Sequence, residues 1–264
     1  MSHKIERVRQ ALRTYDNALV ACSGGVDSGL LLRLAAEILG NRVTAVTAVT
    51  PFAVPEDLMR AAGWGETLPI RYLTVQTAQM DDPAFRANGP DRCYHCKSTL
   101  FRTLTGLARS QALAVILDGT NADDAKTHRP GLRATEEFGI RSPLREAGLT
   151  KTEIRKAARE YGVPHWDQPS ESCLCTRIPY GRPISPADLR QIALAEDFLR
   201  NDLGLRVVRV RHHGDTARIE TEPEVLGRLA EQPTAQTIHR YLRSLGFRFV
   251  TVDLAGYRSG VFDL

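Results

Sequence analysis

The sequence has no long hydrophobic run, and its first six residues do not form an apolar stretch. It contains no stretch of about 18 consecutive apolar residues, the length that indicates a membrane-crossing helix. Its first residues, Met1 to Glu6, are mostly charged or polar, whereas a secretory signal requires an apolar core. These absences argue against a transmembrane helix in this sequence. We therefore expect a cytoplasmic protein with no membrane partner.

The sequence also has little excess of charge of either sign. The 264 residues carry 35 Lys and Arg against 31 Asp and Glu, a formal net charge of +4. This excess fits an anionic small-molecule substrate and does not by itself indicate nucleic acid, so we expect no nucleic-acid partner. Hydrophobic residues make up 42% and charged residues 25%, which excludes a disordered chain.

A glycine-rich turn lies between an apolar strand and a leucine-rich helix. Its sequence is Ser23-Gly24-Gly25-Val26-Asp27-Ser28. The turn lacks the Gly-Lys-Ser/Thr ending of the Walker loop and the glycine spacing of dinucleotide-binding folds. Glycines let backbone N–H groups approach an anion, the helix start attracts negative charge, and Asp27 offers a carboxylate for Mg²⁺ or for capping. The motif resembles the pyrophosphate loop (PP-loop) of enzymes that cleave ATP between its α and β phosphates.

Strands and helices alternate through the first part of the chain. Apolar periodicity predicts four strands and three intervening helices, with strands near 18–22, 42–50, 71–75 and 114–118, and helices near 29–39, 55–63 and 98–110. This alternation predicts an α/β fold in which helices cover both faces of a doubly wound parallel sheet. Ligands of such sheets bind at the carboxyl ends of the strands. We therefore expect an ATP-binding domain over residues 1–170.

The pattern changes after residue 170. Residues 171–185 are rich in Pro, Gly and Ser and contain two cysteines, which indicates a hinge. Residues 186–264 alternate helices with a hairpin, which predicts a smaller α+β domain for substrate binding or oligomerisation. We expect exposed apolar side chains at Leu242, Leu245 and Phe249 to support a homo-oligomer, and His212 and His213 to lie in a solvated hairpin turn.

Four of the five cysteines form two close pairs. Cys93 and Cys96 are three residues apart, and Cys173 and Cys175 are two apart. Disulfides are rare in the cytoplasm, whereas thiolates at such spacing suit zinc or an iron–sulfur cluster. Neighbouring Arg and Lys side chains favour the thiolate forms. The alternative is a set of structural thiols with no ligand.

Several further segments resemble the LarE family of ATP-dependent sulfur transferases over residues 8 to 262. They are Asp118-Gly119-Thr120-Asn121, Arg129-Pro130-Gly131, Ser142-Pro143-Leu144, Arg177-Ile178-Pro179-Tyr180-Gly181 and Gly256-Tyr257-Arg258-Ser259-Gly260. The resemblance implies that a carboxylate of pyridinium-3,5-biscarboxylic acid mononucleotide is adenylated. Sulfur then displaces AMP to give a thiocarboxylate, a step in the biosynthesis of the nickel-pincer nucleotide cofactor.

The resemblance also implies roles for individual residues. Pyrophosphate and Mg²⁺ would be held by the PP-loop residues Ser23, Gly24, Gly25, Asp27 and Ser28. The adenine nucleotide would be bordered by Thr50, Gly119 and Arg129. The anionic substrate would face Glu196, Arg209 and Arg211; the last two are two positions apart on an expected strand and therefore share a face.

The source of the sulfur remains open between several alternatives. Resemblance to the cluster-dependent branch implies a [4Fe–4S] cluster held by Cys93, Cys96 and Cys173, with Cys175 as an alternative ligand and an external sulfur donor. Single-cysteine members instead sacrifice one thiol, which would be Cys173 or Cys175. Structural zinc is a third alternative. A tRNA-thiolating enzyme, an amidotransferase related to NAD or GMP synthetase, or a non-catalytic nucleotide-binding regulator would also account for the PP-loop motif.

Overall fold

The computed structural model describes residues 1–126, 130–168 and 172–258. These residues group into two units. The N-terminal unit comprises Met1–Phe85 and Pro90–Glu171, and the C-terminal unit comprises Arg86–Gly89 and Ser172–Leu264. Among the described residues, no helix has both the length and the apolar character that crossing a membrane requires.

Four parallel strands form the sheet of the N-terminal unit, in the order β3-β2-β1-β4. They are β1 (Ala18–Ala21), β2 (Val43–Val49), β3 (Arg71–Gln76) and β4 (Ile116–Leu117). In the register, Val20 lies beside Ala45 of β2 and Leu117 of β4. The order places β1 between two neighbours, so the loop after β1 begins at the middle of the sheet.

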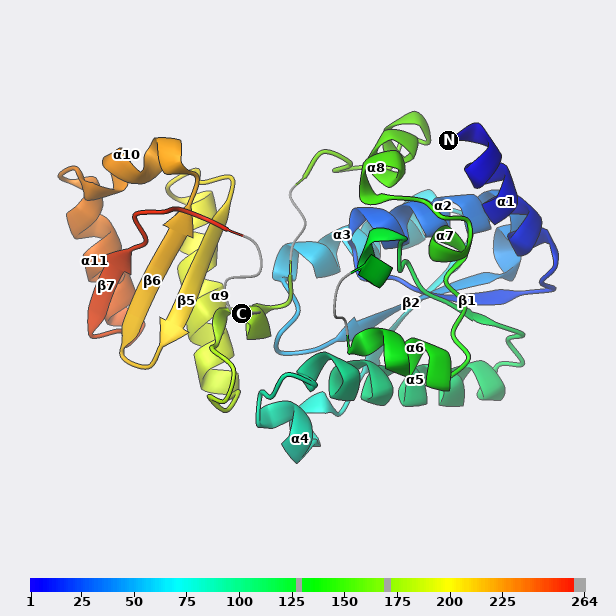
Figure 1. Cartoon of the computed structure of the whole chain (residues 1–264), viewed down its shortest axis with the longest axis horizontal. Coiled ribbons are helices and arrows are strands. Elements are labelled where there is room, and N and C mark those ends of the chain that lie inside the picture. The colour runs from blue at the N-terminus through cyan, green and yellow to red at the C-terminus, as the bar shows by residue number, and fades with distance from the viewer. Residues whose placement is uncertain (127–129, 169–171, 259–264) are drawn as a thin grey trace. The chain divides into compact units, whose positions relative to one another are not determined.

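Helices pack on both faces of this sheet (Figure 1). They are α1 (Ser2–Arg13), α2 (Val26–Leu39), α3 (Pro55–Thr67), α5 (Arg92–Ser110), α6 (Gly131–Glu137), α7 (Pro143–Glu146) and α8 (Lys151–Glu160). The short helix α4 (Pro83–Arg86) lies between β3 and α5 in the sequence. Val20 and Ala45 pack with apolar residues of α1, α2 and α8, whereas Leu19 and Val46 pack with those of α5 and α6. Successive strand residues point to opposite faces, so this division follows from the pleat. The predicted doubly wound α/β fold is confirmed.

Helix α5 begins six residues before the start expected near residue 98. Its first turn forms because the N–H groups of Tyr94 and His95 donate to the Asp91 carbonyl, at 2.9 and 3.2 Å. The apolar periodicity that marks the rest of α5 is absent from this polar turn, so no hydrophobic signal predicted it. Cys93 and Cys96 therefore lie on the first turns of α5, ahead of the helix start expected near residue 98.

The C-terminal unit contains a three-stranded sheet in the order β5-β6-β7. Its elements are α9 (Pro186–Asn201), β5 (Val208–His213), β6 (Thr216–Thr221), α10 (Leu226–Ala230), α11 (Thr234–Ser244) and β7 (Phe249–Val252), with a 3₁₀ turn η4 at Leu174–Arg177. β5 and β6 are antiparallel, and β7 joins β6 in parallel. Apolar residues of α9, α11 and the sheet form a common core. The expected smaller α+β arrangement is confirmed.

Two expectations for this unit were wrong. His212 lies on β5 and is only 2% exposed, because the strand continues to His213, which pairs with Thr216. Its Nε2 lies 2.8 Å from Gln191 Oε1 on α9, which replaces the solvent expected there. Leu242 is fully buried because it packs in the core beneath α11. Phe249, by contrast, is half exposed, as expected.

Candidate active site

The loop after β1 folds around the Ser28 hydroxyl. Ser28 Oγ accepts a hydrogen bond from the Ser23 N–H at 3.2 Å and donates to the Gly25 carbonyl at 3.1 Å. Ser23 Oγ lies 3.1 Å from the same oxygen. Gly25 caps α2 in an extended conformation without a capping side chain. The loop therefore leads directly into the N-terminus of a 14-residue helix, an arrangement suited to binding phosphate.

Two other segments approach this loop so closely that glycine is required. Gly24 has a φ of +82°, and a Cβ at this position would collide with the main chain of Asp57 in α3. Gly119 follows β4, and a Cβ there would lie 2.7 Å from the Ser28 nitrogen. The backbone at the start of α2 is thus packed between the ends of two neighbouring elements. This close packing holds the loop in one conformation.

Asp27 connects three elements of the N-terminal unit. Lys151 Nζ, at the start of α8, lies 2.7 Å from both carboxylate oxygens of Asp27. Asn121, in the loop after β4, donates from Nδ2 to Asp27 Oδ2 at 3.0 Å. The start of α8 is itself fixed by a capping box between Thr150 and Glu153. Lys151 was not among the site residues predicted from the sequence, although Thr150 and Glu153, on either side of it, have the spacing of a helix-capping pair.

A second buried carboxylate orders the loop after β4. Asp118 accepts from the hydroxyls of Ser142 and Thr120, at 2.6 and 2.7 Å, and pairs with Lys97 Nζ at 3.2 Å. Burial alone would raise the pKa of Asp118, but Lys97 and the two hydroxyls outweigh burial and hold this pKa below its usual value. Lys97 directly follows Cys96 on α5, so the same contact ties the cysteine-bearing helix to the loop that carries Gly119.

Two further residues, Thr50 and Arg129, were expected to border the adenine nucleotide. Thr50 follows β2, the neighbour of β1, and its carbonyl accepts from the Ala53 N–H at 3.3 Å. Parallel strands end at one edge, so Thr50 and the loop after β1 lie at the same edge of the sheet. Arg129 lies outside the described residues.

The two cysteine pairs belong to different units. On α5 of the N-terminal unit, Cys93 is exposed and Cys96 is half-buried, and their spacing places them about one helical turn apart. In the C-terminal unit, Cys173 is half-buried and Cys175 is fully buried. Across residues 1–126, 130–168 and 172–258, no three His, Cys, Asp or Glu side chains come together in a group able to hold a metal ion.

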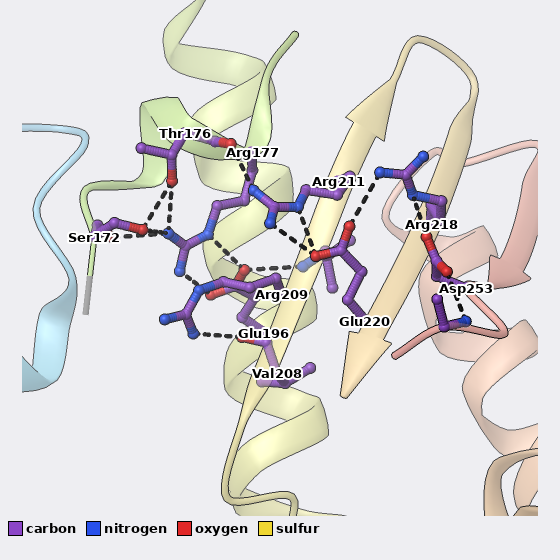
Figure 2. Close-up of polar contacts among 12 residues, drawn as sticks. Ser172, Thr176, Arg177, Glu196, Val208, Arg209, Arg211, Arg218, Glu220 and Asp253 are labelled. Atoms are coloured by element: carbon purple, nitrogen blue, oxygen red, sulfur yellow. Dashed lines mark hydrogen bonds and ion pairs between the residues drawn. The ribbon is translucent and has the colours of Figure 1, made fainter. Parts of the chain in front are cut away.

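Glu196 on α9 is the centre of a buried network of charges in the C-terminal unit (Figure 2). Arg177 donates from Nε and Nη2 to the two Glu196 oxygens, at 2.8 and 2.9 Å. Arg200 and the Val210 N–H donate to the same carboxylate, each at 2.9 Å. Burial opposes ionisation of Glu196, but Arg177, Arg200 and Arg209 outweigh it and hold its pKa low. The network therefore contains a charged carboxylate with no exposure to solvent.

A neighbouring carboxylate, Glu220 on β6, extends this network. Arg211 of β5 lies 2.7 Å from it, and Arg218 lies 3.0 Å from it. Arg209 is 1% exposed, donates to the Val208 carbonyl and stacks its guanidinium 5.0 Å from the Tyr257 ring. The structure thus brings Glu196, Arg209 and Arg211 together, as implied, but all three side chains are buried. Arg177 begins one of the segments that resemble the LarE family, but no role was predicted for it. Glu220 was not predicted from the sequence, because its only signal was a charged residue in a strand-forming segment.

Comparison with known proteins decides the family. The chain is 37% identical over 251 residues to the pyridinium-3,5-bisthiocarboxylic acid mononucleotide synthase of Lactiplantibacillus plantarum, covering 95% of this chain and 90% of that protein. The chain belongs to the LarE family. An uncharacterized protein of Synechocystis is 40% identical, over 98% of this chain and 97% of its own. No family model matches the chain.

A more distant relative supports the PP-loop fold of this LarE-family chain. One component of the glutamine-hydrolysing GMP synthase of Thermoplasma volcanium is 27% identical, over 64% of this chain and 59% of its own. The predicted family and the predicted PP-loop fold are both confirmed. This LarE-family protein is therefore an enzyme of the PP-loop class that uses ATP.

Proposed function

We propose that this enzyme activates a carboxylate of pyridinium-3,5-biscarboxylic acid mononucleotide with ATP and replaces AMP with sulfur. The observation that carries the proposal is the identity to the Lactiplantibacillus plantarum synthase along nearly the whole of both chains. The PP-loop geometry supports it, because the loop presents main-chain N–H groups at a helix start, where a phosphate binds.

In the adenylation step, a substrate carboxylate oxygen attacks the α-phosphorus of ATP and pyrophosphate leaves. We assign the pyrophosphate to Ser23, Gly24, Gly25 and Ser28, whose N–H and hydroxyl groups stabilise the departing negative charge. We assign the adenine nucleotide to Thr50, Gly119 and Arg129. Activation converts a poorly electrophilic carboxylate into a mixed anhydride, which a sulfur nucleophile can attack.

Asp27 has the chemistry of a Mg²⁺ ligand, because a hard cation prefers carboxylate oxygens. Its side chain is 18% exposed and lies at the PP-loop, and both of its oxygens accept from Lys151. Bound Mg²⁺ would neutralise charge on the phosphates during adenylation. Before Mg²⁺ binds, Lys151 would hold the Asp27 carboxylate in place. When Mg²⁺ is bound, the Lys151 ammonium group would provide a second positive charge near the PP-loop.

For the substrate, we propose that Arg209 and Arg211 provide the positive charge that attracts its anionic groups. Support comes from the excess of guanidinium over carboxylate groups in their surroundings: Arg177, Arg200, Arg209, Arg211 and Arg218 against Glu196, Glu220 and Asp253. Glu196 orients Arg177 and Arg200 in this scheme, because its carboxylate accepts hydrogen bonds from both.

For the sulfur, we propose that Cys93, Cys96 and Cys173 hold a [4Fe–4S] cluster, with Cys175 as the alternative ligand. When bound and recharged by an external donor, such a cluster would supply the sulfide that replaces AMP on the activated carboxylate. The donor set suits it, because all three ligands are cysteine thiols and Arg92 and Lys97 flank the first pair.

Sacrifice of a protein cysteine is the competing route. Here a thiolate attacks the adenylate and releases AMP, giving a thioester. Loss of the cysteine α-proton then breaks the Cβ–S bond, which leaves dehydroalanine and releases the thiocarboxylate. Burial favours Cys173 over Cys175 for this route, because Cys175 has no exposed surface from which to reach a substrate.

The activity is tested with the full chain purified without oxygen and incubated with ATP, Mg²⁺ and the biscarboxylate mononucleotide. We expect pyrophosphate release that depends on the mononucleotide, together with a product in which one oxygen is replaced by sulfur. Asp27→Asn should reduce pyrophosphate release at least about tenfold. Substrate-independent release, or sulfur incorporated into bulk tRNA in place of the mononucleotide, would contradict the proposal.

The sulfur source is tested by measuring iron and acid-labile sulfide on the same protein. About four of each per chain, lost in Cys93→Ala but kept in Cys22→Ala, would support the cluster. Cys22 is the matched control because it is a buried thiol outside both pairs. Protein without iron that acquires dehydroalanine at Cys173 during one turnover would support the sacrificial route instead.

A further inference from the structure

The segment that carries Cys173 and Cys175 is folded around the guanidinium group of Arg177 (Figure 2). Arg177 Nη1 lies 2.7 Å from the Ser172 carbonyl, 2.9 Å from Ser172 Oγ, 3.0 Å from Thr176 Oγ1 and 3.3 Å from the Cys173 carbonyl. Ser172 Oγ and Thr176 Oγ1 lie 2.9 Å from each other, and Thr176 Oγ1 donates to the Cys173 carbonyl at 2.9 Å. One nitrogen thus gathers four oxygens of the segment.

The opposite edge of the same guanidinium is fixed to the core of the C-terminal unit. Nε and Nη2 of Arg177 bind both oxygens of Glu196, and neither side chain has any exposed surface. Glu196 is held in turn by the Val210 N–H of β5. Arg211, also on β5, donates to the Thr176 carbonyl at 2.8 Å. The cysteine segment is therefore attached at two points to α9 and β5.

These contacts require the planar fork of an arginine. One edge of the guanidinium pairs with a carboxylate while a terminal nitrogen donates to carbonyl and hydroxyl oxygens on the other side. A lysine ammonium is a single centre and cannot span both sets. The main chain at Cys173 is fixed by this arrangement, while the Cys173 side chain stays half-buried and Cys175 is fully enclosed.

We propose that Arg177 is a positioning residue for sulfur transfer: anchored by Glu196, it holds the 172–176 main chain so that the Cys173 thiol is presented and Cys175 is enclosed. This inference rests on the proposed function, in which thiols of this segment take part in sulfur transfer. It assigns Arg177 no contact with the substrate. Arg177 would have this role whether the Cys173 thiolate serves as a cluster ligand or is sacrificed.

The test compares Arg177→Lys with Arg200→Gln in the full chain. Arg177→Lys keeps a positive charge beside Glu196 but removes the fork. Arg200→Gln is the matched control, because it removes another hydrogen bond to Glu196 and keeps every contact of Arg177 with the segment. The first readout is the alkylation rate of each cysteine by iodoacetamide, followed peptide by peptide. The second is the ratio of thiocarboxylate formed to pyrophosphate released.

In Arg177→Lys we expect Cys175 to be alkylated at least tenfold faster than in the wild type, with Cys22 still protected. The protection of Cys22, in the core of the N-terminal unit, distinguishes loosening of the segment from global unfolding. The thiocarboxylate-to-pyrophosphate ratio should fall at least tenfold in Arg177→Lys and by a clearly smaller factor in Arg200→Gln, which keeps the contacts of Arg177 with the segment.

An unchanged alkylation pattern and an unchanged ratio in Arg177→Lys would overturn the inference. Equal effects of the two substitutions would also overturn the inference. They would show that the lost hydrogen bond to Glu196, and not the contacts of Arg177 with the segment, causes the effect. If the wild type releases no substrate-dependent pyrophosphate, the proposed function fails, and the alkylation rates still decide whether Arg177 positions the segment.

Discussion

The PP-loop and the network around Arg177 and Glu196 both hold polar groups in fixed positions, but they do so in different ways. The PP-loop uses six consecutive residues, two hydroxyls and main-chain groups, and its shape depends on the absence of a side chain at Gly24. The network uses charged side chains from η4, α9, β5 and β6, and those of Arg177, Glu196 and Glu220 have no exposure to solvent.

Because of this difference, the two regions should be sensitive to different kinds of substitution. Added volume should disrupt the PP-loop, since neighbouring main chain fills the space beside Gly24. Removal of charge should disrupt the network, because each buried ion relies on a partner for the solvation it has lost. A substitution that adds volume in the PP-loop and one that removes a charge from the network therefore test the two regions separately.

The largest effect is expected for Glu196→Ala. It leaves Arg177 buried without its carboxylate, and breaking such a pair costs about 3–5 kcal/mol in the free energy of unfolding. Urea unfolding, with hydrogen exchange of β5 and β6 peptides, measures this cost in the C-terminal unit. The control is Lys4→Met, which removes the partly exposed Lys4–Glu153 pair and should cost about 0.5 kcal/mol. Equal costs would show that burial does not decide the contribution of these pairs.

A smaller effect is expected for Gly24→Ala, which combines a positive φ with a collision against Asp57. We expect a loss of about 3 kcal/mol in the N-terminal unit and weaker ATP binding. Gly25→Ala is the matched control in the same loop, because its Cβ would meet only Ser23 Oγ at 3.5 Å. Its cost should stay below about 1 kcal/mol. Calorimetry of ATP binding and thermal unfolding check both variants, and similar losses would contradict the steric explanation.

The smallest effect is a difference in pH dependence between the units. Burial lowers the pKa of His212, against a smaller opposing effect of Asp188. The unfolded chain, with a histidine pKa near 6.5, therefore takes up the proton first, and stability falls as the pH drops through this value. The lowered pKa of Asp118 instead costs the N-terminal unit stability only below about 3.8.

Hydrogen exchange at pH 7.5 and 5.5 should therefore show loosening of β5 but not of β1. His212→Gln should reduce the change in β5, while His3→Gln, at an exposed position of α1, serves as the control for loss of one histidine. Equal loosening of both strands, or no effect of His212→Gln, would show that His212 does not set this difference.

By itself, the sequence determined the features that depend on neighbours along the chain. The PP-loop motif, the apolar strands around it and the alternation of strand with helix all follow from local pattern, and they sufficed to predict the α/β fold. Further short segments, such as Arg177 to Gly181, carried the resemblance to the LarE family. The capping box at Thr150 and Glu153 is a local feature of the same kind, because its two residues are three positions apart. Such features need only residues a few positions apart.

Only the tertiary structure decided which distant residues meet. Asp27 and Lys151 are 124 positions apart, and Arg177 and Glu196 come from a 3₁₀ turn and a helix. The burial of His212 and Cys175 likewise depends on which elements cover them. Charged residues carry no periodic signal for their partners, because long-range ion pairs are set by the packing of whole elements rather than by local preference.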